Sequence, residues 1–417
     1  MSSSTIAIRP RRGVPPAGSA AARDRWVRRR IGIVWGLLFL NVLTFAGGTW
    51  SGQPLIVPIP TVLGKIVTQA ALPVAMLLAL SVNRRVILRP NVFLSVLTLL
   101  VIEALVSSVH PVGHLSGTLY RTARLGGFVA TLWLLSPWWG RRDLLLVRSH
   151  VKVLTVVIIS VILGFLVSPG RALAGGRLSG AFWPTPPTQV ADFAAVLIGL
   201  MVVLWLCGLE RGRRTLLVLV VVGVMLVLTH SRTELVAMVA GILVAGLSIF
   251  TARARVRRVL VAFGVVTSLG VTVFSGVLTA WLDRGENAKE LASLTGRTSV
   301  WNLVLSAPRD PFQIVFGYGL SNKSFNGLPI DSNWLASYYD LGAAGVVICA
   351  ALLLWVLVAA YFQLGGAQRA LALFLVTYLV VTSFTETGFS DASVALLELA
   401  LAASLLVVPY HRDRPPP

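Results

Sequence analysis

The segment VLIGLMVVLWLCGLERGRRTLLVLVVVGVMLVLTHSRTELVAMVAGILVAGLSIF, residues 196–250, decides the fold of this chain. It contains parts of three apolar runs. An arginine cluster, Arg211, Arg213 and Arg214, separates the first two, and a short polar turn at 229–232 separates the last two. Such runs approach the roughly 20 residues that a helix needs to cross a bilayer core about 30 Å thick. The segment therefore predicts membrane-spanning helices joined by short loops.

The same pattern extends along the whole chain, which is 56% hydrophobic and only 12% charged. A soluble domain carries about 25% charged residues, so the composition excludes an ordinary soluble protein. We predict an all-α membrane bundle of about twelve spanning helices. The apolar runs lie near 31–48, 57–82, 91–109, 118–138, 150–168, 188–209, 214–229, 233–250, 259–282, 333–362, 370–385 and 391–409.

The formal net charge of +20 raises the question of a nucleic-acid partner. The arginines instead form short clusters between apolar runs, without interleaved aromatics or a nucleic-acid motif, so no nucleic acid is expected. The positive-inside rule places these clusters, and both termini, in the cytoplasm. We expect a disordered basic tail over 1–30, a transmembrane domain over 31–410 and a cytoplasmic tail over 411–417.

One loop on the predicted outer side is much longer than the others. It covers residues 283–332, between the ninth and tenth predicted helices, and holds Trp301 among other aromatic and charged residues. Long structured loops often carry function. We therefore expect a protein of the cytoplasmic membrane whose working surface faces away from the cytoplasm.

Several arginines lie on that outer side, against the positive-inside bias. A charge within the membrane costs about 2.5–3.5 kcal/mol on insertion scales, so something must balance them. Protein carboxylates such as Asp192, Glu234 and Glu386 are one solution, and a shared anionic ligand is the other. The planar guanidinium suits phosphate oxygens, which favours a diphosphate site. The proposed diphosphate ligands are Arg121, Arg177, Arg232 and Arg297.

Groups able to act as catalysts lie near these arginines. His230 is close to Arg232 in the sequence, and Asp331, Ser332 and Asn333 cluster where the long loop re-enters the membrane. A hydrogen-bonded surface histidine and a simple helix N-cap are the competing interpretations. The outer segments show no metal-ligand spacing, so neither a metal nor another cofactor is expected.

Taken in order, these segments resemble the O-antigen ligase and polymerase superfamily, which are membrane glycosyltransferases acting on polyprenyl-diphosphate-linked glycans. The resemblance rests on the order of short motifs over about residues 118–345. These are an R-x-x-G-x-F element at Arg177, Gly180 and Phe182 with the nearby Pro186; the SRT turn at 231–233; a G-R-x-x-x-W element at Gly296, Arg297 and Trp301; FGYG at 316–319; and an S-N-x-L…G-x-x-G element that starts at Ser332 and ends at Gly342 and Gly345.

The resemblance implies an inverting, metal-independent transferase for surface polysaccharide. Its partners would be a polyprenyl-diphosphate-linked glycan donor, a glycan or lipid acceptor, and the bilayer. A departing diphosphate needs charge stabilisation rather than an acid, and arginines supply it. The ligase branch usually has a catalytic His-Asn pair where this chain has Ser332 and Asn333 after Asp331. A polymerase therefore stays open, as does an acidic base at Asp331.

A transporter or flippase is the alternative, in which the arginines only escort an anionic headgroup. It predicts charged groups in inner as well as outer cavities, whereas the inner half offers few, Lys65 and Glu103 among them. A structural scaffold subunit has no positive feature in its favour.

Overall fold

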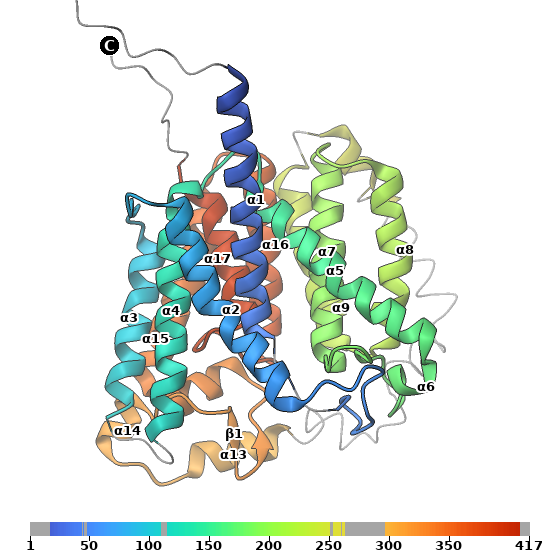
Figure 1. Cartoon of the computed structure of the whole chain (residues 1–417). Helices are drawn as coiled ribbons and strands as arrows, with labels where there is room; N and C mark the ends of the chain where they lie inside the picture. The colour runs from blue at the N-terminus through green and yellow to red at the C-terminus, as the bar shows by residue number, and fades with distance from the viewer. Residues whose placement is uncertain are drawn as a thin grey trace, which may run out of the picture.

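The computed structural model describes residues 17–43, 45, 48–109, 115–250, 253–259, 261–262 and 297–408. Over these residues the chain forms a bundle of helices (Figure 1), and the strands are a short hairpin of β1 (Ser324–Phe325) and β2 (Leu328–Pro329). The predicted all-α class is confirmed. Among the described residues, four helices are long and apolar enough to cross a membrane: α2 (Thr61–Val82), α5 (Leu145–Val167), α7 (Pro187–Leu206) and α15 (Asn333–Phe362).

The other helices complete the bundle. Each predicted run coincides with a helix except 259–282, which lies almost entirely outside the described residues, so the number of spans and their orientation remain predictions. The remaining elements are α1 (Ala17–Val42), α3 (Val92–Ser107), α4 (Leu115–Leu135), η1 (Ser136–Trp138), α6 (Pro169–Ala172), α8 (Gly212–Leu228), α9 (Arg232–Ser248), α13 (Arg297–Ser306), α14 (Pro311–Phe316), α16 (Ala367–Thr382) and α17 (Val394–Leu406).

Helix α1 begins earlier than the sequence predicts. Disorder was expected up to residue 30, but the helix already starts at Ala17. Alanine and arginine, frequent in this stretch, are strong helix formers. Arg28 also pairs with Asp24 one turn away at 2.6 Å and with Asp143, ahead of α5, at 2.9 Å. Propensity and ion pairs therefore extend the helix beyond its apolar part.

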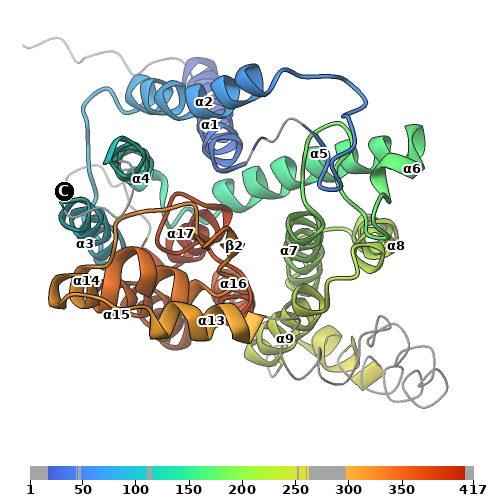
Figure 2. The same ribbon diagram turned by 90° about the horizontal axis from the view of Figure 1, so that it is seen from below.

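Helix α16 forms the centre of the bundle and packs against α7, α9, α15 and α17 (Figure 2). The tightest contact is at Phe374, where α7 and α9 each place a glycine. A Cβ at Gly199 would lie 1.9 Å from the Phe374 ring, and one at Gly241 would lie 2.9 Å from it. Because larger residues would collide there, these helices sit close together and bring the loops at their ends into proximity.

Helix α15 is broken where the segment after α14 crosses it. Gly342 has φ of +62°, and a Cβ there would lie 2.4 Å from the carbonyl of Val315. Gly317 has φ of +75°, and its Cβ would lie 2.4 Å from the carbonyl oxygen of Asp340. Gly342 of the predicted G-x-x-G element thus provides a backbone break that seats the FGYG stretch.

Candidate functional site

Four segments meet at the end of the bundle that carries α13 and α14, here called the α13 end (Figure 1). They are the loop 173–186 before α7, the turn 229–231 before α9, the segment 330–333 at the start of α15 and the loop 383–393 between α16 and α17. Distant parts of the sequence thus combine here, and the following paragraphs build the site from their side chains.

Arg177 anchors the loop 173–186 to the end of α8. Its Nε donates to the carbonyl of Thr229 at 2.8 Å, and the amide of Leu178 donates to the carbonyl of Leu228 at 2.9 Å. Burial lowers the pKa of the Arg177 guanidinium, while the carboxylates of Glu234 and Glu386 act in the opposite direction. Arg177 therefore lies within electrostatic reach of two acids from other helices and loops.

Arg297 begins α13 and faces the start of α15. Its Nε lies 3.4 Å from Oδ2 of Asp331, and the two side chains are 26% and 39% exposed. A charge-assisted N–H···O hydrogen bond is usually about 2.7–2.9 Å, so this contact is loose. The charge of Arg297 also acts on Arg177, Glu234 and Glu386. A loose, partly solvated ion pair leaves the guanidinium able to exchange partners.

The carboxylates of the site come from three different segments. Glu234 is buried in the first turn of α9, where the hydroxyl of Ser231 donates to its Oε2. Among the described residues, its other oxygen has no hydrogen-bond partner. Glu386 lies in the loop 383–393. Burial raises the pKa of the Glu386 carboxyl well above its ordinary value, the nearby carboxylates of Glu234 and Asp331 add to the rise, and Arg297 opposes it.

His230 and Arg232 lie on the turn that leads into α9. His230 has φ of +53°, a left-handed conformation in which histidine is several-fold enriched among non-glycine residues. Arg232 is the first residue of the helix, and both side chains are partly exposed. The turn thus places them between Thr229, which binds Arg177, and Glu234.

Ser332 and Asn333 serve the architecture of the site through their described contacts. Ser332 is the buried N-cap residue of α15. The side-chain oxygen of Asn333 accepts from the amides of Gly388 at 3.1 Å and Phe389 at 2.7 Å. These bonds clamp the loop 383–393 onto α15 and hold Glu386 near Asp331. These contacts give Asn333 a positioning role through its side-chain oxygen, and its predicted role as a catalytic group stays a prediction.

Arg121 belongs to a second group of charges, with Arg124 and Asp391. Arg121 lies 4.0 Å and Arg124 3.8 Å from Oδ2 of Asp391. Arg124 also donates to the carbonyl of Asn41 at 2.9 Å and to that of Ala392 at 3.1 Å. Whereas Arg177 and Arg297 act on Glu234 and Glu386, Arg121 faces Asp391, so the structure divides the predicted diphosphate ligands between two places.

Residues on and next to α13 pack against the first turns of α15. Arg309 stacks on Tyr338, with its guanidinium carbon 4.2 Å from the ring centre, and donates to the Tyr338 carbonyl at 3.2 Å. Val300 and Val304 of α13 pack against α15 in a small buried cluster. Trp301, on the same helix, is partly buried, whereas Gly296 lies outside the described residues. Gly345, deeper in α15, sits against Leu341, where a Cβ would approach to 2.1 Å.

Glu386, Asp391 and Arg309 are the members of this region that sequence reasoning missed as site residues. Glu386 was considered only as a partner for an arginine. The sequence could have indicated it, because a carboxylate beside an apolar run is about as costly in the membrane as an arginine and equally needs a partner. Its position next to Asp331 required the loop 383–393 to fold back on α15.

The arrangement combines cations for an anionic ligand with carboxylates that can accept a proton. Guanidinium groups bind phosphate oxygens in two-pronged geometry, and a carboxylate of raised pKa is a good base near neutral pH. Within the described part of the chain, no cluster of three or more His, Cys, Asp or Glu side chains has the geometry to hold a metal ion.

Residues 217–340 match a protein-family model described as O-antigen ligase. The matched segment contains Arg232, Glu234, Arg297 and Asp331, whereas Arg177 and Glu386 lie outside it, so the family match covers part of the site. The resemblance to the O-antigen ligase and polymerase superfamily is thereby confirmed, and the apolar helices make the chain a membrane protein. No curated protein matches the sequence.

Proposed function

We propose that the protein is an inverting, metal-independent glycosyltransferase on the outer face of the cytoplasmic membrane. It transfers or polymerises a glycan carried on a polyprenyl diphosphate, in the assembly of a surface polysaccharide. The observation that carries this proposal is the meeting of Arg177 and Arg297 with the carboxylates of Glu234, Asp331 and Glu386 beside the O-antigen ligase segment.

Arg177, Arg232 and Arg297 bind the diphosphate in this proposal. The loose contact of Arg297 with Asp331 lets a phosphate oxygen take the place of the carboxylate. As the bond between the anomeric carbon and the diphosphate breaks, its electron pair leaves with the diphosphate. Preorganised donors stabilise that developing charge without a proton transfer to the leaving group.

The acceptor hydroxyl attacks the anomeric carbon from the face opposite the diphosphate, and a carboxylate takes its proton. We assign this role to Glu386, because its raised pKa makes its carboxylate more basic than an ordinary one. Asp331 orients Arg297 and is the second candidate for the base. Glu234, tied to Ser231 at the start of α9, adds negative charge that keeps the arginines in place.

The test uses the purified full-length protein in lipid discs, with a polyprenyl-diphosphate oligosaccharide and without nucleotide or added metal. Mass spectrometry would follow the lipid and the glycan separately. Free polyprenyl diphosphate with glycans lengthened by whole repeats identifies a polymerase, and release that requires a separate acceptor identifies a ligase. Intact donor with every acceptor tried contradicts the proposal.

A second candidate, movement of a lipid-linked substrate across the membrane, is favoured by ionisable groups deep in the bundle. His150 Nε2 lies 3.6 Å from Oε1 of Glu398, with both side chains fully buried, and Tyr378 donates to Asp192 at 2.7 Å. Such groups line substrate and proton pathways in transporters. Protein-dependent transfer of a fluorescent polyprenyl-diphosphate glycan between leaflets of liposomes, lost in Glu398→Gln, would establish this function.

A further inference from the structure

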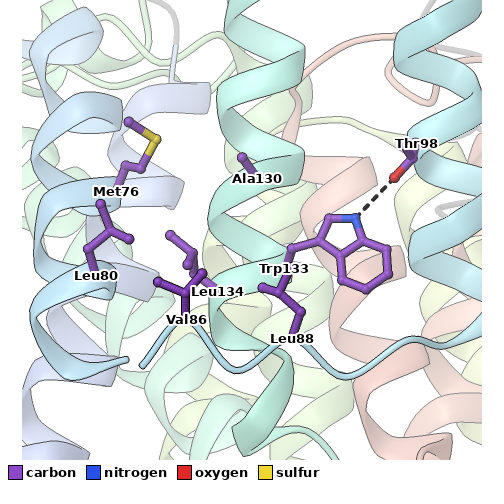
Figure 3. Close-up of a pocket in the computed structure, with 8 residues that line it drawn as sticks. All are labelled: Met76, Leu80, Val86, Leu88, Thr98, Ala130, Trp133 and Leu134. Atoms are coloured by element: carbon purple, nitrogen blue, oxygen red, sulfur yellow. Dashed lines mark hydrogen bonds between the residues drawn. The ribbon is translucent and has the colours of Figure 1, made fainter. Parts of the chain in front are cut away.

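A second candidate binding site lies at the opposite end of the bundle from α13. There, α2, α3, α4 and the turn between α2 and α3 line an open cavity of about 410 Å³ at the surface of the bundle (Figure 3). Met76 and Leu80 come from α2, Ala130 and Trp133 from α4, and Val86 from the turn. Cavities of this size accommodate ligands, and ligand sites usually lie in the range of about 300–1,000 Å³.

The lining is almost wholly apolar. Its polar groups, the hydroxyl of Thr98 and the indole N–H of Trp133, are joined in a hydrogen bond of 3.0 Å that Figure 3 shows across the cavity wall. Because these groups satisfy each other, the wall offers little to a polar ligand. The ligand that fits such a wall is a hydrocarbon chain.

The turn at the edge of the cavity is held in a strained conformation. Val86 has φ of +46°, which is rare for a β-branched residue. Buried Asn83 maintains the turn: its side-chain oxygen accepts from the amide of Ile87 at 2.9 Å, and its side-chain nitrogen donates to the carbonyls of Ile87 at 2.8 Å and Leu134 at 3.0 Å. These hydrogen bonds hold the turn against its strain and keep Val86 in the cavity wall.

The same turn presents cations at the rim of the cavity. Arg84 and Arg85 directly precede Val86 and are exposed. Arg30 of α1 reaches the same end of α2, where its guanidinium donates to the hydroxyl of Ser81 at 2.8 Å. The acids on this side, Asp24 and Asp143, are engaged by Arg28. An apolar cavity between helices thus has a positively charged rim.

We propose that this cavity binds an anionic phospholipid, with an acyl chain between α2, α3 and α4 and the phosphate at Arg84 and Arg85. Basic pockets between membrane helices bind anionic headgroups, and juxtamembrane arginines attract anionic lipid. The same chemistry occurs in a polyprenyl phosphate. The phospholipid is favoured because the cavity lies at the other end of the bundle from the arginines proposed to hold the donor (Figure 1).

The proposal is tested by native mass spectrometry of the full-length protein released from detergent, with three probes at equal concentration. These are a phosphatidylglycerol, a phosphatidylcholine with the same chains, and undecaprenyl phosphate. Phosphatidylglycerol is expected to bind most tightly. The double variant Arg84→Ala/Arg85→Ala should weaken its binding about 10- to 30-fold and leave phosphatidylcholine unchanged.

Three further variants separate the charge from the cavity. Arg84→Lys/Arg85→Lys should keep the preference, because the phosphate needs the charge. Arg213→Ala/Arg214→Ala, which removes two exposed arginines from the first turn of α8, should also keep it. Ala130→Trp should fill the cavity and reduce binding of every lipid.

Equal affinity for the phosphatidylglycerol and the phosphatidylcholine would overturn the proposal, and so would an unchanged preference in the Arg84→Ala/Arg85→Ala variant. Tighter binding of undecaprenyl phosphate would replace the phospholipid with a polyprenyl lipid. Because the two arginines are exposed, their double variant remains informative even where Ala130→Trp fails to fold. None of these outcomes depends on glycosyl transfer.

Discussion

Two groups of arginines at the α13 end have different surroundings. Arg124 is 18% exposed, hydrogen-bonds the carbonyls of Asn41 and Ala392 and lies 3.8 Å from Asp391. Arg297 is 26% exposed, and among the described residues its ion-pair partner is Asp331, in a loose contact of 3.4 Å. An arginine surrounded by carbonyls and a buried acid stabilises the fold, whereas one in a loose pair retains donors for a ligand. Contact geometry thus distinguishes the two arginines, and it favours Arg297 over Arg124 for the proposed binding of the diphosphate.

The largest expected effect is a loss of protein stability when Arg124 is replaced. Arg124→Ala leaves Asp391, whose side chain is only 9% exposed, without its nearer partner, and removes three hydrogen bonds to Asn41 and Ala392. Loss of one member of a buried ion pair costs about 3–5 kcal/mol in unfolding free energy. Denaturant unfolding of the protein in detergent micelles measures it.

Arg121→Ala is the matched control, because its contact with Asp391 is 4.0 Å and its side chain is more exposed. A change of about 0–1 kcal/mol is expected there. If both variants unfolded at the wild-type denaturant concentration, Arg124 would not have the structural role assigned to it.

The next largest effect is on the rate of the proposed transfer. Arg297→Ala should lower turnover of the polyprenyl-diphosphate donor about 10²–10³-fold, the usual cost of removing one donor to a developing negative charge. Its unfolding free energy should change by less than about 1 kcal/mol, because the pair with Asp331 is partly exposed. Arg297→Lys should recover part of the rate, since lysine keeps the charge but not the planar fork. Wild-type turnover in Arg297→Ala would remove this residue from the site.

Variants of Asn333 test whether the loop 383–393 must be held against α15 for the proposed glycosyl transfer at Arg297 and Glu386. Asn333→Ala leaves the amides of Gly388 and Phe389 without their acceptor, at a cost of about 1–3 kcal/mol in unfolding free energy. Transfer should fall as well, because Glu386 loses its fixed position. Asn333→Asp keeps an acceptor oxygen and should lose less stability. If Asn333→Ala abolished transfer with unfolding unchanged, Asn333 would be a catalytic residue after all.

The smallest effect is a shift in pH dependence at Glu386. Because its pKa is raised, the carboxyl stays neutral at pH values where an ordinary glutamate is ionised. A base must be ionised, so turnover should rise with pH through this raised pKa, and Glu386→Gln should remove that rise. Asp331→Asn should keep a rise but move it to lower pH, because the Asp331 carboxylate contributes to the raised pKa of Glu386.

The same raised pKa has a consequence for stability. The neutral form of Glu386 is favoured in the folded protein, so its contribution is present below the ordinary carboxyl pKa and is lost as pH rises through the raised value. Glu386→Gln should therefore be less sensitive to rising pH than the wild type in thermal unfolding. If turnover of the Glu386→Gln variant depended on pH in the same way as turnover of the wild type, Glu386 would be excluded as the base.

The sequence predicted much of this architecture and part of the site. Arg177 and Arg297 were identified because arginine is disfavoured on the predicted outer side, and both lie among the site carboxylates in the structure. Arg121 was grouped with them by the same argument, yet it faces Asp391, from a loop far along the chain. Charge bias shows which cations need a partner, but it does not distinguish a protein carboxylate from a ligand.

By itself, the sequence determined the helical membrane bundle, because the length and apolarity of a run depend only on local composition and the thickness of a bilayer. It also indicated the resemblance to the O-antigen ligase and polymerase superfamily, since the order of short motifs is a property of the chain alone. The tertiary structure decided which arginine meets which carboxylate, that Asn333 clamps the loop carrying Glu386, and that Gly342 breaks α15. These features depend on contacts between segments far apart in sequence, and electrostatic and steric forces act over distances in space rather than along the chain.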